Sequence, residues 1–334
     1  MKKYDSSEPR NTKLMIFAGG LESVFYRRCG FFMKIITGFI EKHFWVVLVS
    51  GILLGLLPQA DVDASPIVPK LLLGMMLFLA YLKIDALEII ENMKNFKRMA
   101  WISFVYMIAI PLLFFLPFRL IDKELAMAIL LLTSMPAGVS SPVLTDIARG
   151  NISLSMSLVI ATQLLAPFTV PMLFWLVDIG SVSIDKLLIL RDIAILVFVP
   201  MIVSQLVKRI LPRTVEKTQH LFTSLNVLIL FSFVYITISS QREVILGNPA
   251  GVIWKLSVLY IVFILLHIIG YIICPLKGKE NRIAVAIGAA YMNNGLAIVL
   301  AVSYFSPEIL VLMVLSEIPW NTLLAPFKKV AARL

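Results

Sequence analysis

Stretches of about 20 apolar residues recur along the whole chain, and this repetition limits the possible folds more than any other feature. A helix of about 20 residues is long enough to cross a bilayer. Of the 334 residues, 60% are hydrophobic and only 15% are charged, whereas soluble domains carry about 25% charged residues. One soluble core cannot bury this apolar surplus. The sequence therefore predicts an all-α, multi-pass membrane protein.

Ten apolar stretches have the length and composition of membrane spans. They cover residues 44–58, 66–84, 99–118, 125–149, 151–177, 191–211, 219–239, 249–273, 282–304 and 308–328. Residues 1–43 form a polar and basic tail without the apolar core of a cleaved signal peptide. Apolar and polar residues alternate at helical spacing in 31–43, which predicts an interfacial helix. Residues 329–334 are expected to form the other tail.

The basic residues indicate how the spans are oriented. If both termini are cytoplasmic, the cytoplasmic segments hold 22 of the 30 lysines and arginines, and the opposite loops hold five, including Arg119 and Arg191. Such a bias is typical of proteins in the cell (inner) membrane with the basic loops in the cytoplasm. The net charge of +10 is thus explained by the lipid bilayer as partner, and nucleic acid is not expected.

Two short motifs occur once in each half of the chain. Leu-Leu-Ala-Pro-Phe stands at 164–168 and again at 323–327, while Met135-x-x-Gly138 recurs as Met292-x-x-Gly295. Almost the same offset separates the members of each pair, which favours a duplication of five spans, 44–177 and 184–328. Because five is odd, the second copy must be inverted, as in many secondary transporters, whose sites lie where the copies meet.

Both copies of the Met-x-x-Gly motif contain helix-breaking residues in mid-span. Span 4 carries prolines, a glycine and serines at 134–142, and span 9 carries Asn-Asn-Gly at 293–295. Backbone groups released inside a membrane must face protein or a cavity, and half-helix N-termini suit anions. We therefore predict a substrate site for a small organic anion made of Gly138, Ser140, Ser141, Asn293, Asn294 and Gly295. The alternative is that these residues only permit kinks and close helix packing.

Two titratable side chains lie inside spans, Glu317 in span 10 and His267 in span 8. Ionisable groups at such positions are costly and usually functional, so both are candidates for coupling to an ion. The alternatives are a protonated, hydrogen-bonded carboxyl group and a neutral packing histidine. The three histidines are scattered, and the chain has no HExxH, GxSxG or P-loop pattern. No enzyme activity, metal site or cofactor is expected.

Spans 4, 5, 8 and 9 resemble those of the bile-acid:sodium symporter family. The similarity rests on PAGVSSPVLTDIARGNISLSMSLVIATQLLAPFTVP (136–171), on Leu266-His267-x-x-Gly270-Tyr271, and on Met292-Asn293-Asn294-Gly295-Leu296-Ala297. The resemblance implies ten helices as two inverted five-helix repeats. It also implies a panel of spans 1, 2, 6 and 7, a core of the other six, and broken helices 4 and 9 that cross at the site.

The same resemblance implies two sodium sites, whose ligands match only in part. Ser141 and Ser155 stand at serine positions of the first site. The family's other oxygen ligands fall on residues without a side-chain oxygen, namely Pro142, Val159, Gly288 and Met292, and its span 3 glutamine falls near Tyr106. A hard cation needs more oxygens than two hydroxyls. The family's two-sodium chemistry is therefore not expected, and Na⁺ and H⁺ both stay candidate coupling ions.

The leading interpretation is a secondary transporter of small organic anions. The main alternative is a proton-driven efflux carrier of the arsenite type, because Glu317-Ile318-Pro319 is similar to an acidic-x-Pro element of those carriers. Those carriers rely on a cysteine in span 4, and this chain has none there. A membrane-embedded enzyme or receptor is a third class, but the short loops offer no catalytic segment.

Overall fold

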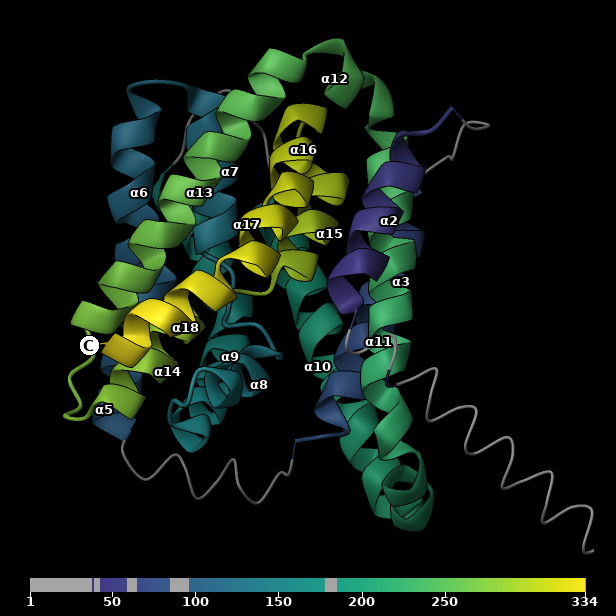
Figure 1. The fold of residues 1–334 in the computed structure, drawn as a ribbon, viewed down its shortest axis with the longest axis vertical. Coiled ribbons are helices and arrows are strands. Elements are labelled where there is room, and N and C mark those ends of the chain that lie inside the picture. The colour runs from purple at the N-terminus through teal and green to yellow at the C-terminus, as the bar shows by residue number, and fades with distance from the viewer. Residues whose placement is uncertain (1–37, 39–42, 59–64, 85–95, 178–184, 334) are drawn as a thin grey trace, which may run out of the picture.

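The computed structural model describes residues 38, 43–58, 65–84, 96–177 and 185–333, which are almost entirely helical (Figure 1). The interfacial helix expected at 31–43 lies outside these residues, apart from Gly38 and His43. Within the described ranges no strand is formed, and extended pairing is limited to one isolated bridge between Ala137 and Met292.

The described residues form the following helical elements. In chain order they are α2 (Phe44–Leu56), α3 (Ile67–Tyr81), α5 (Phe96–Phe104), the π-helical turn η2 (Val105–Ala109), α6 (Ile110–Arg119), α7 (Lys123–Thr133), α8 (Ser141–Ile147), α9 (Ile152–Leu176), α10 (Lys186–Ile210), α11 (Pro212–Ser240), α12 (Arg242–Gly247), α13 (Pro249–Ile272), α14 (Lys279–Ala290), α15 (Asn294–Tyr304), α16 (Pro307–Leu315), α17 (Glu317–Thr322) and α18 (Leu324–Arg333).

Five of these helices begin at an Asp or Asn whose side-chain oxygen accepts hydrogen bonds from backbone N–H groups of the first turn. The capping residues are Asp122 for α7, Asn151 for α9, Asp185 for α10, Asn248 for α13 and Asn293 for α15. Such a cap satisfies donors that the helix itself leaves unpaired. Local sequence thus fixes where these helices start.

Five continuous helical segments are long and apolar enough to cross a membrane. They are Met99–Arg119, Ile152–Leu176, Leu187–Ile210, Pro212–Ser240 and Pro249–Ile272. A sixth is obtained if Pro307–Thr322 and Leu324–Arg333, which are bent by 43°, count as one span. The apolar helices of α2, α3 and α15 are shorter. The protein is thus a multi-pass membrane protein.

Two helices extend beyond the predicted segment boundaries. Residues 329–333 belong to helix α18, because this amphipathic helix buries Ala331 and the Lys279 Nζ donates a hydrogen bond to the Ala332 carbonyl oxygen at 3.0 Å. Helix α10 begins at Lys186, five residues before the predicted start of span 6, because Asp185 caps it. Arg191, expected in a loop, therefore lies within α10.

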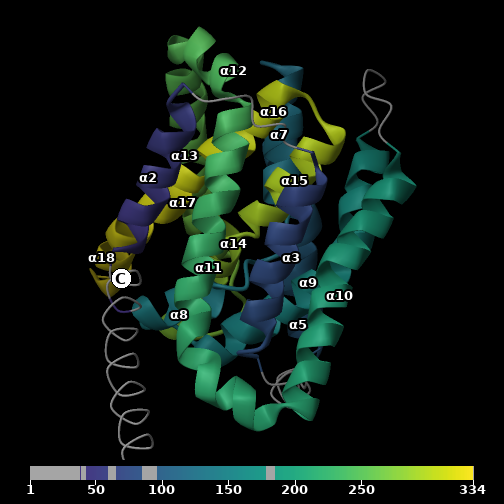
Figure 2. The ribbon, with the colours of Figure 1, turned by 90° about the vertical axis from the view of Figure 1, so that its right-hand side faces the viewer.

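The helices form two groups, seen on the two sides of Figure 1. One group comprises α2, α3, α10 and α11: α2 packs along α11, and α3 packs against α10 and α11 (Figure 2). The other comprises α5–α9 with η2, and α13–α18, in which α14 contacts α8, α9 and α13, and α16 contacts α7 and α15. The two groups meet mainly where α10 packs on α9, with further contacts of α15 on α3 and α16 on α11.

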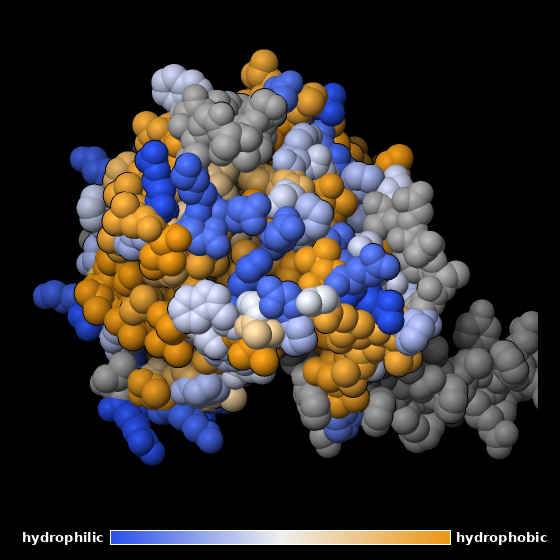
Figure 3. Space-filling view, turned by 90° about the horizontal axis from the view of Figure 1, so that it is seen from above, coloured by the Kyte–Doolittle hydropathy of each residue, from blue (hydrophilic) through white to orange (hydrophobic). Residues whose placement is uncertain are grey.

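Burial separates the central helices from the outer ones. Helix α7 is buried from Leu125 to Thr133, and α15 from Leu296 to Ala301. Leu71, Trp175 and Ile253, in contrast, are exposed large apolar side chains of α3, α9 and α13. Seen from above, apolar residues cover much of the flanks and hydrophilic residues gather across the middle of this end (Figure 3). A lipid environment suits such flanks.

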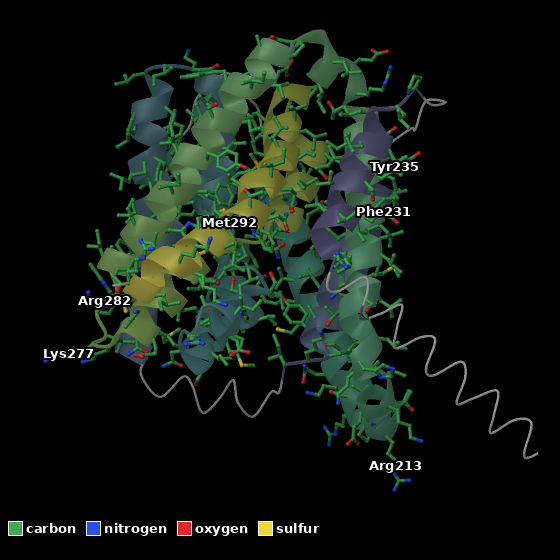
Figure 4. All side chains as sticks on the ribbon, in the orientation of Figure 1. Arg213, Phe231, Tyr235, Lys277, Arg282 and Met292 are labelled. Carbon is green, nitrogen blue, oxygen red and sulfur yellow. The ribbon has the colours of Figure 1, made fainter. Side chains whose placement is uncertain are left out.

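The labelled basic residues Arg213, Lys277 and Arg282 lie toward one end of the molecule (Figure 4). They start α11, precede α14 and lie in the first turn of α14, respectively. The basic-residue bias predicts that these three positions lie on the same side of the membrane.

Candidate functional site

The first interruption lies between the end of α7 at Thr133 and the start of α8 at Ser141. Two side chains of α9 hold it in place. The Ala137 N–H donates to Thr162 Oγ1 at 3.1 Å, and Gln163 Nε2 donates to the Ala137 carbonyl oxygen at 3.3 Å. Backbone groups released from the helix thus find side-chain partners within the protein.

The second interruption lies between the end of α14 at Ala290 and the start of α15 at Asn294. Asn293 Oδ1 accepts a hydrogen bond from the Leu296 N–H at 3.1 Å and so caps α15. Trp320 Nε1, from α17, donates to the Met292 carbonyl oxygen at 3.2 Å. Both spans in which the sequence predicts a break are therefore interrupted, and each break is supported by a neighbouring helix.

The two interruptions contact each other directly. The Gly138 N–H donates to the Tyr291 carbonyl oxygen, and the Asn293 N–H donates to the Pro136 carbonyl oxygen, both at 2.8 Å. The Ser141 hydroxyl group also donates to the Tyr291 carbonyl oxygen, at 3.0 Å. Met292 lies in the middle of the molecule (Figure 4). The predicted proximity of the Gly138–Ser141 and Asn293–Gly295 segments is thus present in the structure.

Close backbone approach explains the glycine of the first motif. A Cβ atom at position 138 would lie 2.8 Å from the Tyr291 carbonyl oxygen and 3.1 Å from that of Met292. Only glycine avoids this overlap with backbone atoms, which cannot move aside like a side chain. Gly138 therefore makes the contact between the two interruptions possible.

The six residues predicted to bind substrate do not all share one environment. Gly138, Ser141 and Asn293 lie where the interruptions meet, and Ser140 is exposed beside them. Asn294 turns to span 10 instead, where its Nδ2 donates to Ser316 Oγ at 3.0 Å. Gly295 faces α3, because a Cβ atom there would lie 2.8 Å from Leu73 Cδ1.

Unpartnered polar atoms gather around the second interruption. Asn293 Nδ2 and the Tyr291 hydroxyl group are buried and have no hydrogen-bond partner among the described residues. The Asn293 residue is 8% exposed. A buried donor without a partner is rare and costs free energy, so it calls for an explanation. An amide N–H beside the N-terminus of α15 can donate to an anion.

The positions of the family's sodium ligands are filled in another way. A Cβ atom at Gly288 would lie 3.0 Å from Cε2 and 3.1 Å from the hydroxyl oxygen of Tyr106. The tyrosine ring thus occupies the space where the family's carboxylate would extend. Ser155, the second candidate ligand, accepts a hydrogen bond from Thr145 Oγ1 at 3.1 Å, and Val159 is fully buried.

The two titratable residues among the four coupling candidates lie near the second interruption. His267 is buried, its Nδ1 is 2.7 Å from the Phe263 carbonyl oxygen, and its ring packs edge-on against Tyr291 at a centroid distance of 5.3 Å. Glu317 is 4% exposed, and Asn321 Nδ2 donates to its Oε2 at 3.3 Å. Within the described part of the chain, no group of three or more His, Cys, Asp or Glu residues is arranged to hold a metal ion.

One buried polar cluster was missed by the sequence analysis. Asp192, in α10, forms an ion pair with Lys70 of α3 at 2.5 Å and accepts a hydrogen bond from the Tyr304 hydroxyl group at 2.7 Å. Arg191 also pairs with it, at 3.1 Å. The sequence does show that Asp192 and Lys70 are charged residues inside apolar stretches. It does not show that they pair, because 122 positions separate them.

The supporting residues of the interruptions were also missed, although the sequence marks them. Thr162-Gln163 and Asn321-Thr322 are polar pairs that directly precede the two copies of Leu-Leu-Ala-Pro-Phe. Thr162 and Gln163 bind the first interruption, and Asn321 binds Glu317. Polar side chains at matching places in both halves could therefore have indicated these supporting residues.

Comparison with known proteins agrees with the resemblance seen in the sequence. The sequence model of the SBF-like CPA transporter family matches residues 42–320, from just before α2 into α17. The protein described as "Uncharacterized sodium-dependent transporter YocS" of Bacillus subtilis (strain 168) is 28% identical over 247 residues, which are 70% of this chain and 74% of that protein. The chain therefore belongs to the SBF-like CPA transporter family, which is similar to the bile-acid:sodium symporters.

Proposed function

We propose that this protein is a secondary transporter that moves small organic anions across the cell membrane by alternating access. The observation that carries the proposal is the contact between two interrupted helices, in which Gly138 and Asn293 donate backbone hydrogen bonds across the gap at 2.8 Å. Interrupted helices at corresponding places in two halves of a transporter mark its binding site. The substrate would bind at this contact.

The chemistry of the site supports an anionic substrate. The N-terminal end of α15 presents backbone N–H groups and the positive end of a helix dipole. The buried Asn293 Nδ2, which lacks a partner among the described residues, provides a further donor beside it. A carboxylate could accept hydrogen bonds from both. The exposed Ser140 hydroxyl group could contact the substrate from the first interruption.

The proposed architecture has ten spans as two inverted five-helix repeats, with both termini cytoplasmic. The first repeat would run from α2 to α9 and the second from α10 to α18. The paired polar residues before each Leu-Leu-Ala-Pro-Phe copy support the duplication. The group α2, α3, α10 and α11 would then move against the rest of the molecule, exposing the site to each side in turn.

Glu317 and His267 are the proposed coupling residues. Both are buried near the second interruption. A change in their charge there would change the electrostatic potential at the substrate site. Transport driven by a pH gradient is expected to lose its pH dependence in Glu317→Gln. The free thiol among the described residues, Cys274, follows α13 rather than lying at the interruptions, so the site offers little support for the arsenite alternative.

The test is uptake into proteoliposomes of a panel of organic acids, with arsenite included and with Na⁺ and pH gradients imposed separately. Asn293→Ala should abolish uptake of the accepted acid, and Ser140→Ala should weaken it. Asn248→Ala is the matched control, because Asn248 caps α13 in the same way but is exposed and distant in sequence from both interruptions. Unchanged uptake in both site variants, or uptake of arsenite alone, would contradict the proposal.

A further inference from the structure

A pocket of about 480 Å³ lies where α3 ends, α10 ends and α11 begins. Helix α3 packs against both α10 and α11 (Figure 2), and the lining residues come from these three helix ends. Lys83, Lys208 and His220 bring basic groups to the pocket, and Leu82 and Val215 form part of an apolar wall. Basic groups beside an apolar wall suit an anionic group that carries an apolar chain.

Positive charge dominates this pocket and its rim. The lining includes one acidic residue, Glu216. Residues 208–220 hold four basic residues, namely Lys208, Arg209, Arg213 and Lys217. Within the described part of the chain, Glu216 forms no ion pair with any of them. Arg213 marks this end of the molecule in Figure 4, and the basic-residue bias predicts that it faces the cytoplasm. The excess charge therefore attracts anionic headgroups of the adjoining leaflet.

Hydrogen bonds hold the two pocket lysines beside the end of α3. Lys208 Nζ donates to the Ile84 carbonyl oxygen at 2.9 Å, and Lys83 Nζ donates to Thr223 Oγ1 in α11. An ammonium group has three N–H donors, and the bond to Ile84 uses one of those of Lys208. Lysine binds phosphate oxygens as a point charge. Lys208 can therefore keep its bond to the chain and donate to a phosphate group at the same time.

An apolar groove of about 410 Å³ runs between α3 and α10. Its lining includes Leu71, Met75, Ile195 and Val199, which are exposed large apolar side chains. Leu73 is buried and faces α15, because a Cβ atom at Gly295 would lie 2.8 Å from its Cδ1. Residues two positions apart on a helix point in nearly opposite directions. The groove therefore lies on the side of α3 that is turned away from α15 and is open to lipid.

The basic pocket and the apolar groove adjoin at Phe78. This ring lines the groove and also packs on the cluster of Leu82, Val215 and Phe222, two of whose members line the pocket. From Phe78 to Lys70 the groove follows α3 for about 12 Å. One leaflet of the hydrocarbon core is about 15 Å deep. The two hollows together match the headgroup and one acyl chain of a phospholipid.

We propose that α3, α10 and α11 bind one anionic phospholipid, with its phosphate group at Lys83 and Lys208 and one acyl chain in the groove. The groove accepts the chain of any phospholipid, whereas the basic pocket selects a headgroup with a net negative charge. Basic pockets between transmembrane helices are suited to such headgroups. The inference goes beyond the proposed function, because this lipid site lies apart from the two interruptions and holds whatever substrate the protein carries.

The test titrates the purified full-length protein, in a non-ionic detergent, with dioleoylphosphatidylglycerol or dioleoylphosphatidylcholine, and counts bound lipid by native mass spectrometry. Both lipids have the same chains, and only the first has a net negative charge. Wild type should bind one phosphatidylglycerol about tenfold or more tightly than phosphatidylcholine, and NaCl should reduce this preference by screening. The thermal midpoint should rise with phosphatidylglycerol, since a ligand stabilises the folded state that binds it.

Two variants test the two parts of the site. Lys83→Gln/Lys208→Gln should lower the affinity for phosphatidylglycerol about tenfold or more and leave that for phosphatidylcholine unchanged. Gly74→Leu should weaken the binding of both lipids, because it fills the groove. The backbone tolerates this change, since a Cβ atom at position 74 meets no atom within 4 Å.

Matched controls separate the pocket from general attraction to a basic surface. Lys217→Gln makes the same chemical change at an exposed position of α11 outside the pocket, and phosphatidylglycerol affinity should stay within about twofold of wild type. Lys208→Arg keeps the charge and should bind like wild type if the double variant fails to fold. Inorganic phosphate at matched concentration should not displace the lipid, because it has no acyl chain.

Four results would overturn the site. These are equal affinity of wild type for the two lipids, unchanged phosphatidylglycerol binding in Lys83→Gln/Lys208→Gln, an equal loss in Lys217→Gln, and displacement of the lipid by inorganic phosphate. The first result would mean that lipid covers this surface without selection. The last would mean that the pocket binds free anions instead of a lipid headgroup.

Discussion

Asp192 and Glu317 are both buried carboxyl groups, but the protein surrounds them in opposite ways. Asp192 has two cationic partners and a tyrosine hydroxyl group, which come from α3, α10 and α15. Glu317 has only amide neighbours among the described residues. A charge that is fully paired within the chain needs nothing further, whereas an unpaired one requires a proton or an ion.

The two carboxyl groups lie near opposite ends of the same helix, α15, and this explains their different surroundings. Helix α15 begins at Asn294, beside Glu317, and ends at Tyr304, which is bound to Asp192. The Asp192 end is fixed by interactions internal to the protein and links α15 to α3 and α10. The Glu317 end has polar atoms left over, which is where a transported or coupling species can act.

The largest expected effect is the loss of stability in Asp192→Ala. Removing this carboxylate leaves Lys70 partly buried and unpaired, and also takes the acceptor from Tyr304. We expect the free energy of unfolding to fall by about 2 kcal/mol or more. Thermal unfolding of the purified protein in detergent checks this. A variant as stable as wild type would mean that the Asp192 cluster does not hold these helices together.

Replacing the whole ion pair by apolar residues should reverse most of that loss. In Lys70→Met/Asp192→Leu no charge is left unpaired, and buried pairs can often be replaced by apolar side chains without a net cost. The double variant should therefore be more stable than Asp192→Ala by about 1–2 kcal/mol. If the double variant is the less stable of the two, the pair itself is stabilising rather than merely compensated.

A smaller effect is expected for Tyr304→Phe. This change removes one hydrogen bond to Asp192 and keeps the aromatic ring. The free energy of unfolding should decrease by about 1 kcal/mol. In the Asp192→Ala background the same change should cost nothing further, because the partner is already gone. Equal costs in both backgrounds would show that the hydroxyl group acts elsewhere.

The smallest effect on stability is expected for Glu317→Gln. No ion pair is broken, and a neutral amide replaces a carboxyl group that is costly to bury when ionised. In choline buffer the free energy of unfolding should change by less than about 1 kcal/mol, and the change should be stabilising if anything. A loss as large as that in Asp192→Ala would remove the distinction between the two carboxyl groups.

Hydropathy and the positions of helix-breaking residues allowed much of the fold to be predicted. Spans 3, 5 and 8 agree with the observed helices within a few residues, because the length of an apolar run is a local property. The first interruption includes Pro136 and Gly138, and the second ends at the capping residue Asn293, since proline, glycine and asparagine end or start helices locally. Helix α10 begins five residues before the predicted start of span 6, because Asp185 caps it there.

The sequence by itself determined the membrane class, the places where two helices break, and the presence of one buried carboxyl group, Glu317. Tertiary structure alone decided which side chains meet: Asp192 with Lys70 and Tyr304, Tyr106 with Gly288, and Glu317 with two asparagines but no cation. Helix formation and helix breaking depend on neighbours within a few positions, so both can be predicted from the sequence. Whether a buried charge is paired depends on residues brought together from distant segments by packing, and so it is visible only in the folded protein.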